Sequence, residues 1–180
     1  MDEIVKAALR KWPHVPHCHG WLALDARGDW YMRDQRIQDA GPFPQVKGSR
    51  IEHDKLREFI GRNYAADETG AWFFQNGPQR VYVLLEAAPW IWRVRHTDSG
   101  FEVSAHTGVQ AGAVRSSWMD ELGRLFLLTD AGFGLVHTLD IGEAAEAVQA
   151  GLWQPQELPF AQMPARFGYV LQPQPQPHPR

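Results

Sequence analysis

The chain has 180 residues, which suits one domain of ordinary size or two small ones that share a core. Apolar residues make up 44% and charged residues 22%, so a sizeable core can be buried. The net charge of -3, with no run of Lys or Arg, argues against nucleic-acid binding, which needs clustered positive charge. The single cysteine, Cys18, excludes an intrachain disulfide and a disulfide-stapled secreted fold.

The sequence contains no recognisable targeting or membrane segment. The N-terminus is acidic and lacks the basic start and apolar stretch of a secretory signal. No window approaches the roughly 18 apolar residues that a membrane-spanning helix requires. We therefore expect a cytoplasmic protein with no membrane partner.

The first third of the chain predicts a helix, a hairpin and a second helix. Residues 2–11 have the apolar spacing of a short amphipathic helix. Residues 13–20 are expected to be irregular, and strands are expected at 21–25 and 29–33. Ser49 and Glu52 form a capping box. It predicts a helix whose apolar face carries Leu56, Phe59, Ile60 and Tyr64.

Asn76-Gly77 predicts the next hairpin, because both turn positions of a type I′ turn need positive φ. A two-residue loop there pairs Phe74 with Gln79 and Trp72 with Val81.

Two further hairpins are predicted in the second half of the chain. Strands at 91–97 and 101–107 meet around Ser99-Gly100, which places Trp92 opposite Thr107 and Arg95 opposite Ser104. Strands at 124–129 and 133–138 meet at Asp130-Ala131-Gly132. Residues 117–123 are expected to form a turn or short helix. A last helix, capped by Asp140, ends near Gly151, and residues 167–171 are expected to form a final strand.

These elements predict an α+β fold in two lobes, with mostly antiparallel, hairpin-rich sheets and two or three helices. The first lobe is expected at residues 1–89 and the second at 90–171. Residues 172–180 alternate glutamine and proline, which predicts a polyproline-type tail with no core of its own. We expect this tail to be dispensable for folding.

The order of these elements resembles an uncharacterised family. The resemblance lies in the Gly-rich hairpin Leu24–Tyr31, the capped helix Ile51–Tyr64, the run Val81–Pro89 and the pair Arg93-Val94. Over about residues 12–108 it is similar to a domain-of-unknown-function family of proteobacteria, two-lobed α+β proteins of about this length. It also resembles a second, larger uncharacterised family of two-lobed α+β build. Both resemblances imply a fold and neither implies a reaction, so no residue role is carried over.

One cluster has the composition of a metal site. Imidazole and thiolate are ligands that borderline and soft metals prefer. Four such groups lie within six residues: His14, His17, Cys18 and His19. In an extended chain His17 and His19 point to one side and Cys18 to the other. The alternative is a loop of imidazoles with a half-buried thiol.

A second cluster is basic. The predicted hairpin places Arg93, Arg95 and His106 on one face, near Tyr82 if the sheet is continuous. Such a face can bind a carboxylate or a phosphate. The alternative is a solvated face that Glu102 neutralises across the strand pair.

The sequence contains no nucleophile elbow, P-loop or dinucleotide fingerprint. Eight Trp and nine Phe indicate an aromatic-rich core or a concave surface. The favoured interpretation is a non-enzymatic module that binds a small ligand or a protein in an aromatic-lined groove between the lobes, without a cofactor. The alternatives are a metal-binding protein and an enzyme of unidentified class. The candidate ligand-binding residues are Trp21, Tyr31, Trp72, Tyr82, Trp92, Arg93, Arg95 and His106.

A homodimer is also expected. Strand Val81–Leu85 and segment Ala88–Trp92 offer more apolar surface than a monomer of this size readily covers. Large apolar patches mark interfaces, and twofold dimers are the commonest assemblies.

Overall fold

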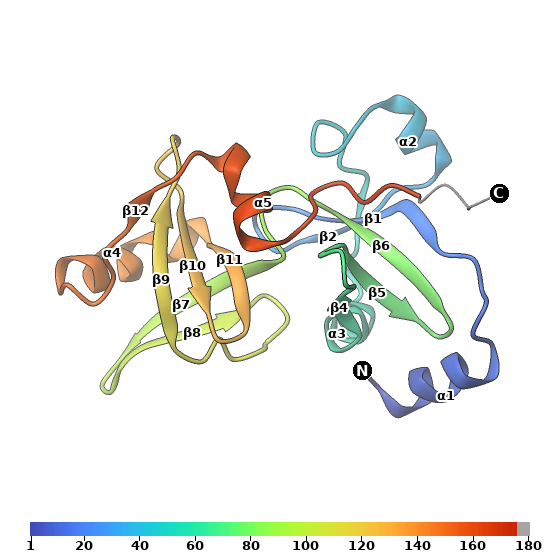
Figure 1. Ribbon diagram of the computed structural model, residues 1–180, viewed down its shortest axis with the longest axis horizontal. Helices are drawn as coiled ribbons and strands as arrows, with labels where there is room; N and C mark the ends of the chain where they lie inside the picture. The colour runs from blue at the N-terminus through green and yellow to red at the C-terminus, as the bar shows by residue number, and fades with distance from the viewer. Residues whose placement is uncertain (176–180) are drawn as a thin grey trace. The chain divides into compact units, whose positions relative to one another are not determined.

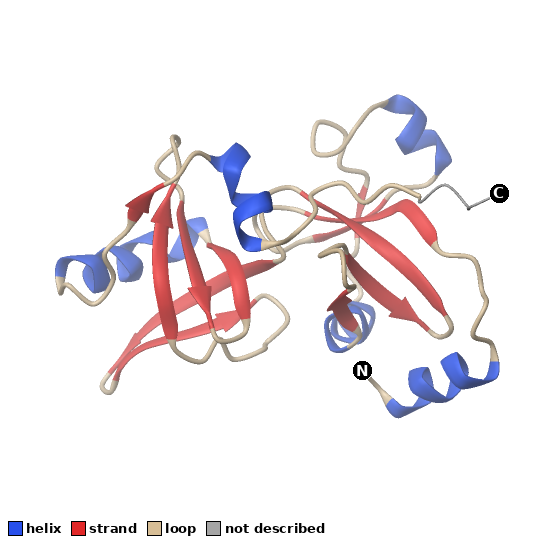
Figure 2. Cartoon of the chain, viewed as in Figure 1, coloured by secondary structure: helices blue, strands red, loops and turns tan. Residues whose placement is uncertain are grey.

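The computed structural model describes residues 1–175, whose strands form two six-stranded sheets, one in each of two compact units (Figure 1). Unit 1 contains Met1–Asp25, Asp29–Glu86 and the chain from Tyr169 onward, and unit 2 contains Ala26–Gly28 and Ala87–Gly168. The chain therefore leaves unit 1 after Glu86 and returns to it at Tyr169. Helices and strands are both well represented (Figure 2), and the predicted α+β class with two lobes is confirmed.

The sheet of unit 1 has the order β3-β2-β1-β6-β5-β4. These strands are β1 Cys18–Leu24, β2 Trp30–Met32, β3 Ser49–Arg50, β4 Tyr64–Ala66, β5 Trp72–Asn76 and β6 Gln79–Leu85. The two central strands, β1 and β6, run parallel, whereas the remaining neighbours are antiparallel. Ala23 and Val83 on the central strands are fully buried.

Within residues 1–175, unit 1 contains three helices. They are α1 Glu3–Lys11, α2 Gln35–Ala40 and α3 Asp54–Arg62. Helix α1 buries Val5 and leaves Ile4 exposed. Helix α3 buries Ile60, and its Phe59 ring meets Phe74 of β5 edge to face at 5.5 Å between centroids. Aromatic pairs prefer this geometry, so the contact fixes α3 on the sheet.

The sheet of unit 2 has the order β12-β9-β10-β11-β7-β8. These strands are β7 Trp90–Thr97, β8 Gly100–Ala105, β9 Val114–Met119, β10 Leu125–Thr129, β11 Gly132–Val136 and β12 Gln156–Glu157. Strand β11 pairs with β7 in parallel, as does β12 with β9, and the other pairs are antiparallel. The core of unit 2 includes Trp92, Phe126 and Leu127, all with 0% exposure.

The helical segments of unit 2 cover this sheet. They are η1 Thr138–Asp140, α4 Ile141–Gln149, η2 Phe160–Gln162 and α5 Met163–Phe167. Helix α4 contacts β7 and buries Ala144 and Ala147 completely. The Phe167 ring stacks on Phe133 at 3.8 Å between centroids. No helix in residues 1–175 has the length and apolar character needed to cross a bilayer.

The predicted register of the β5–β6 hairpin is wrong, because its loop begins one residue later in the chain than expected. Asn76 pairs with Gln79, so the loop is Gly77-Pro78, and Phe74 lies opposite Val81. Gly77 has a φ of 57°, which glycine adopts without strain. Pro78 then lies in the loop, where its missing N–H costs no ladder hydrogen bond.

The register of the β7–β8 hairpin is also wrong. Thr97 pairs with Gly100, so the loop is Asp98-Ser99, and Arg95 lies opposite Glu102 instead of Ser104. Trp92 accordingly pairs with Ala105 and not with Thr107. The next hairpin has the same form, with a two-residue loop, Asp130-Ala131, in place of the three residues expected. In both hairpins a glycine with positive φ, Gly100 or Gly132, opens the second strand.

The predicted capping box is wrong. Ser49 lies in β3, paired with Met32 of β2. Helix α3 is capped instead by His53, whose Nδ1 accepts a hydrogen bond from the Leu56 N–H at 3.3 Å. Tyr64 lies beyond the helix, in β4.

Several other segments differ from their predicted structure. The irregular segment ends early, because β1 already begins at Cys18. Helix α2 was not predicted, and β9 replaces part of the turn or helix expected at 117–123. The expected final strand at 167–171 is absent from the described chain, since α5 ends at Phe167. The last helix does begin after Asp140, but that carboxylate makes no capping hydrogen bond.

Candidate functional site

Residues 169–175 return to unit 1 and lie against its sheet, beside β6 in Figure 1. The Leu85 N–H donates to the Leu171 carbonyl at 2.8 Å, and the Val170 N–H donates to the Gly70 carbonyl at 3.1 Å. Gln172 donates from Nε2 to the Phe43 carbonyl at 3.3 Å. Pro173 is buried. The first part of the predicted tail is therefore docked on unit 1, and residues 176–180 of that prediction lie outside the described residues.

This C-terminal segment forms one wall of a pocket of about 610 Å³, which we call the unit 1 pocket. Its size lies within the range of small-molecule sites. Val170, Pro173 and Pro175 supply apolar surface on the wall. Apart from Gln174 of the same segment, the polar and charged groups come from the chain at the start of β1, the turn before β5 and strand β6: His17, His19, Asp67, Glu68, Thr69, Arg80 and Tyr82.

Tyr82 is held in the unit 1 pocket by Asp67. Its hydroxyl donates to Asp67 Oδ2 at 2.9 Å. Asp67 Oδ1 accepts from the Thr69 N–H at 2.9 Å, from Thr69 Oγ1 at 2.7 Å and from the Ala71 N–H at 3.1 Å. Burial acts to raise the pKa of Asp67, but the hydrogen bonds from Thr69, Tyr82 and Ala71 outweigh it, so the pKa is lowered. Asp67 is thus an ionised group whose acceptor capacity the protein itself uses.

Two imidazoles flank the Tyr82 ring. His19 stacks on it with centroids 4.5 Å apart, and His17 approaches edge-on at 5.9 Å. Burial lowers the pKa of both histidines, and the charge of Arg80 lowers that of His17 further. Both shifts favour the neutral form of the ring, which can donate one hydrogen bond and accept one. The expected common side for His17 and His19 agrees with their shared contact to Tyr82.

The same residues do not assemble a metal site. Among residues 1–175 no group of three or more His, Cys, Asp or Glu side chains is placed to hold a metal ion. Burial raises the pKa of the Cys18 thiol, which favours the protonated form over the thiolate that metals bind. The metal-binding alternative, with His14, His17, Cys18 and His19 as ligands, gains no support from the described structure.

Arg80 is the cation of the unit 1 pocket. Its guanidinium lies over the Phe73 ring, 4.4 Å from the centroid. Within residues 1–175 no ion pair involves Arg80, although many other arginines have a carboxylate partner. The Arg80 guanidinium is therefore held by the Phe73 ring and by its proximity to the Tyr82 hydroxyl, without a carboxylate partner among the described residues.

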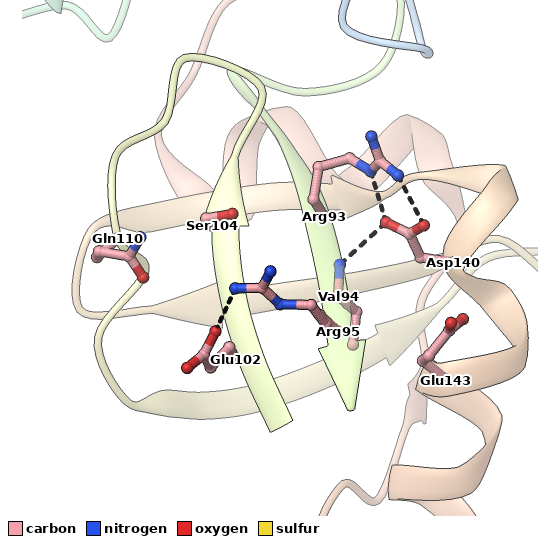
Figure 3. Close-up of a pocket in the computed structure, with 8 residues that line it drawn as sticks. All are labelled: Arg93, Val94, Arg95, Glu102, Ser104, Gln110, Asp140 and Glu143. Atoms are coloured by element: carbon pink, nitrogen blue, oxygen red, sulfur yellow. Dashed lines mark hydrogen bonds and ion pairs between the residues drawn. The ribbon is translucent and has the colours of Figure 1, made fainter. Parts of the chain in front are cut away.

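A second pocket, of about 400 Å³, lies in unit 2 and contains part of the predicted basic patch (Figure 3). Arg93 makes a bidentate contact with Asp140, with Nε–Oδ2 at 2.6 Å and Nη2–Oδ1 at 2.9 Å. The Val94 N–H also donates to Asp140 Oδ2, at 3.0 Å. Arg95 donates to Glu102 Oε2 at 2.7 Å across the strand pair. Both guanidinium groups are neutralised within the unit, in line with the alternative of a solvated face.

The contact between Arg93 and Asp140 shifts the pKa of both groups. Burial acts to raise the pKa of Asp140, but the hydrogen bonds from Arg93 and Val94 prevail and lower it. The hydrogen bond to Asp140 raises the pKa of Arg93. The position of Asp140 before α4 indicated only a helix cap, so its place in this pocket could not be predicted from the sequence.

The other predicted ligand-binding residues are dispersed. Trp21 on β1 is 42% exposed, whereas Trp92 is fully buried and donates from Nε1 to the Leu127 carbonyl at 3.2 Å. Trp92 is thus a core residue and cannot line an open groove. Trp72 packs on Tyr64 at 4.6 Å between centroids. Tyr31 lies 5.6 Å from the Lys47 ammonium, and His106 Nδ1 accepts from the Ile91 N–H at 3.2 Å.

Comparison with solved structures finds matches to two proteins. A DUF1285 family protein from Silicibacter pomeroyi DSS-3 aligns with a TM-score of 0.50 at 12% identity, covering 81% of this chain and 84% of that one. A DUF1285 family protein from Shewanella baltica OS155 aligns with a TM-score of 0.48 at 14% identity, covering 70% of this chain and 91% of that one. At such identities the likeness concerns the fold alone. No curated protein matches the sequence.

Comparison with protein families finds a match over residues 1–174 to DUF2944, described as "Protein of unknown function (DUF2946)". The match extends well beyond the 12–108 region from which an uncharacterised family was expected, and it confirms that expectation. The chain therefore belongs to this family of unknown function, which has no assigned activity.

Proposed function

We propose that the protein is a non-enzymatic module that binds a small molecule in the unit 1 pocket. The observation that carries the proposal is the fixed position of Tyr82, hydrogen-bonded to Asp67 and stacked on His19, inside a pocket of about 610 Å³. Small-molecule sites combine apolar walls with a few oriented polar groups. In the unit 1 pocket, Val170 and the prolines form the apolar wall, and the histidines and Arg80 are the oriented polar groups.

Binding is favoured over catalysis by the state of the reactive groups. A nucleophilic mechanism needs an activated nucleophile beside an oriented base. Burial raises the pKa of the Tyr82 phenol, so it stays protonated at neutral pH, and burial keeps Cys18 a thiol. The Asp67 carboxylate already accepts four hydrogen bonds. These groups can orient a ligand but are poorly suited to attack one.

A fragment screen by two-dimensional amide NMR tests the proposal. We expect hits to shift the amides of residues 67–71, 79–82 and 169–175. Replacing His19 by alanine removes part of the wall and should weaken the hits about threefold or more. His14→Ala is the matched control, since His14 is exposed and does not line the pocket. Hits that map elsewhere, or that respond equally to both variants, would contradict the proposal.

The cytoplasmic location and the homodimer are part of the proposal. The apolar segments Val81–Leu85 and Ala88–Trp92 are, however, largely buried within the single chain. Val83, Ile91 and Trp92 from the two apolar segments each have 0% exposure within the single chain. Light scattering that gives the mass of one chain at micromolar concentration would reject the dimer.

A further inference from the structure

The unit 1 pocket contains a cation that the protein does not neutralise. Of the acidic residues that line the pocket, Asp67 already accepts hydrogen bonds from Tyr82, Thr69 and Ala71, and Glu68 is exposed. Arg80 takes part in no ion pair within residues 1–175. By contrast, Arg93 and Arg95 in the pocket of unit 2 are each paired with a carboxylate. The charge of Arg80 is therefore available to a bound anion.

Arg80 is also oriented before any ligand binds. Its guanidinium lies 4.4 Å from the centroid of Phe73, a ring that is only 4% exposed. Contact with a buried ring limits the mobility of the guanidinium, which also lies within hydrogen-bonding reach of the Tyr82 hydroxyl. Its five N–H donors leave capacity for a ligand beside that contact. A planar fork of this kind matches the two oxygens of a carboxylate. Arg80 and His17 both line the pocket, and the Arg80 charge adds to the effect of burial in lowering the pKa of His17.

The remaining walls indicate the rest of the ligand. Ala71, Val170 and Pro173 offer apolar surface, and the neutral imidazoles of His17 and His19 offer single hydrogen bonds without adding charge. A polyanion such as a phosphate would meet only one cation among the lining residues described and would lie near Asp67 and Glu68. A monocarboxylate needs only that one cation.

We infer that the ligand of the unit 1 pocket is a small organic acid, with its carboxylate bound by Arg80 and a planar apolar body between the imidazoles and the C-terminal segment. This inference rests on the proposed function and specifies its ligand class. It also assigns Arg80 as the residue that selects for a carboxylate.

The test compares three probes that share a phenyl ring and differ in charge: benzoate, benzamide and benzylamine. We expect benzoate to shift the amides of residues 67–71 and 79–82 in an NMR titration and to bind about tenfold more tightly than the other two. Arg80→Gln should remove this preference, so that benzoate binds no more tightly than benzamide. Arg80→Lys, which keeps the charge without the fork, should retain part of it. Arg57→Gln, on α3 of the same unit and outside the pocket, is the control.

The amide spectrum of each variant shows whether it is folded. If benzamide binds as well as benzoate, or if Arg80→Gln binds benzoate like the natural chain, the inference is overturned. The proposed function would survive that result, because fragments without a carboxylate would still occupy the pocket. If none of the three probes shifts pocket residues, the inference is also overturned, and the fragment screen alone decides the proposed function.

Discussion

Replacing Asp140 by alanine should destabilise the protein by about 3 kcal/mol. The Asp140 side chain is only 9% exposed, whereas Arg93 is 49% exposed. The ion pair itself is therefore partly screened and contributes about 1 kcal/mol. The substitution also leaves the buried Val94 N–H without its acceptor, which costs about 2 kcal/mol. The backbone donor, and not the ion pair, thus supplies most of the effect.

Glu102→Ala in the same pocket is the matched control. It breaks the Arg95–Glu102 pair, whose side chains are 77% and 52% exposed. An exposed pair of this kind is worth about 0.3 kcal/mol, and no buried donor depends on it. Urea unfolding followed by tryptophan fluorescence measures both variants. A loss for Asp140→Ala within 0.5 kcal/mol of that for Glu102→Ala would refute the reasoning.

The same pair predicts a pH dependence. The pKa of Asp140 is lower in the folded protein than its ordinary value, so its contribution is present above the unfolded pKa, about 3.9. It is lost as the pH falls through the folded pKa. The stability difference between the natural chain and Asp140→Asn should therefore be constant from pH 7 to 5 and shrink below pH 4. A difference that stays constant down to pH 3 would show that the charge of Asp140 is not involved.

Three further substitutions test packing and hydrogen bonding by urea unfolding. Gly134→Ala should destabilise by more than 2 kcal/mol, because the added Cβ would lie 2.6 Å from the Trp90 carbonyl oxygen and 2.4 Å from Trp92 Nε1. Gly142→Ala, in helix α4 with nothing within 4 Å of the new methyl group, should stabilise by about 0.5–1 kcal/mol. Tyr82→Phe should cost about 1 kcal/mol through the lost hydrogen bond to Asp67; no loss would mean that this bond is dispensable.

The hairpins could be predicted from the sequence because their signals are local. Asn-Gly, Ser-Gly and Asp-Ala-Gly each mark a place where the backbone needs positive φ. The registers could not be predicted, because a glycine can be the first or the second residue of the loop, or the first residue of the next strand. Gly77 is the first loop residue where the second was expected, and Gly100 opens the next strand. The observed loop also contains Pro78, which would lack a donor in the strand.

Only some residues of each candidate site could be predicted from the sequence, because each site joins residues that are distant along the chain. The common side of His17 and His19 follows from strand geometry, but their partner Tyr82 reaches them through the parallel pairing of β1 with β6. No local sequence pattern indicates that a strand pairs in parallel with another strand about 60 residues away. Asp140 and Arg93 were likewise each assigned a local role, a cap and a basic patch, before the fold paired them.

The last prediction concerns the C-terminal segment, which the sequence presents as dispensable. The described structure argues otherwise, because Gln172 donates to the Phe43 carbonyl and Pro173 is buried. A chain ending at Leu171 loses that hydrogen bond, worth about 0.5–1 kcal/mol, and the buried ring of Pro173, worth about 1 kcal/mol. At this size the combined loss of about 1.5–2 kcal/mol lowers the melting temperature by about 3–8 °C.

A chain ending at Pro175 keeps every contact that the structure describes and is the control for this truncation. We expect it to melt with the full-length protein and to bind benzoate equally well. The chain ending at Leu171 should also bind benzoate more weakly, because Pro173, Gln174 and Pro175 form part of the pocket wall. Equal melting temperatures for all three chains would restore the view of a dispensable tail. A lower melting temperature with unchanged benzoate binding would mean that the segment stabilises unit 1 without shaping its pocket.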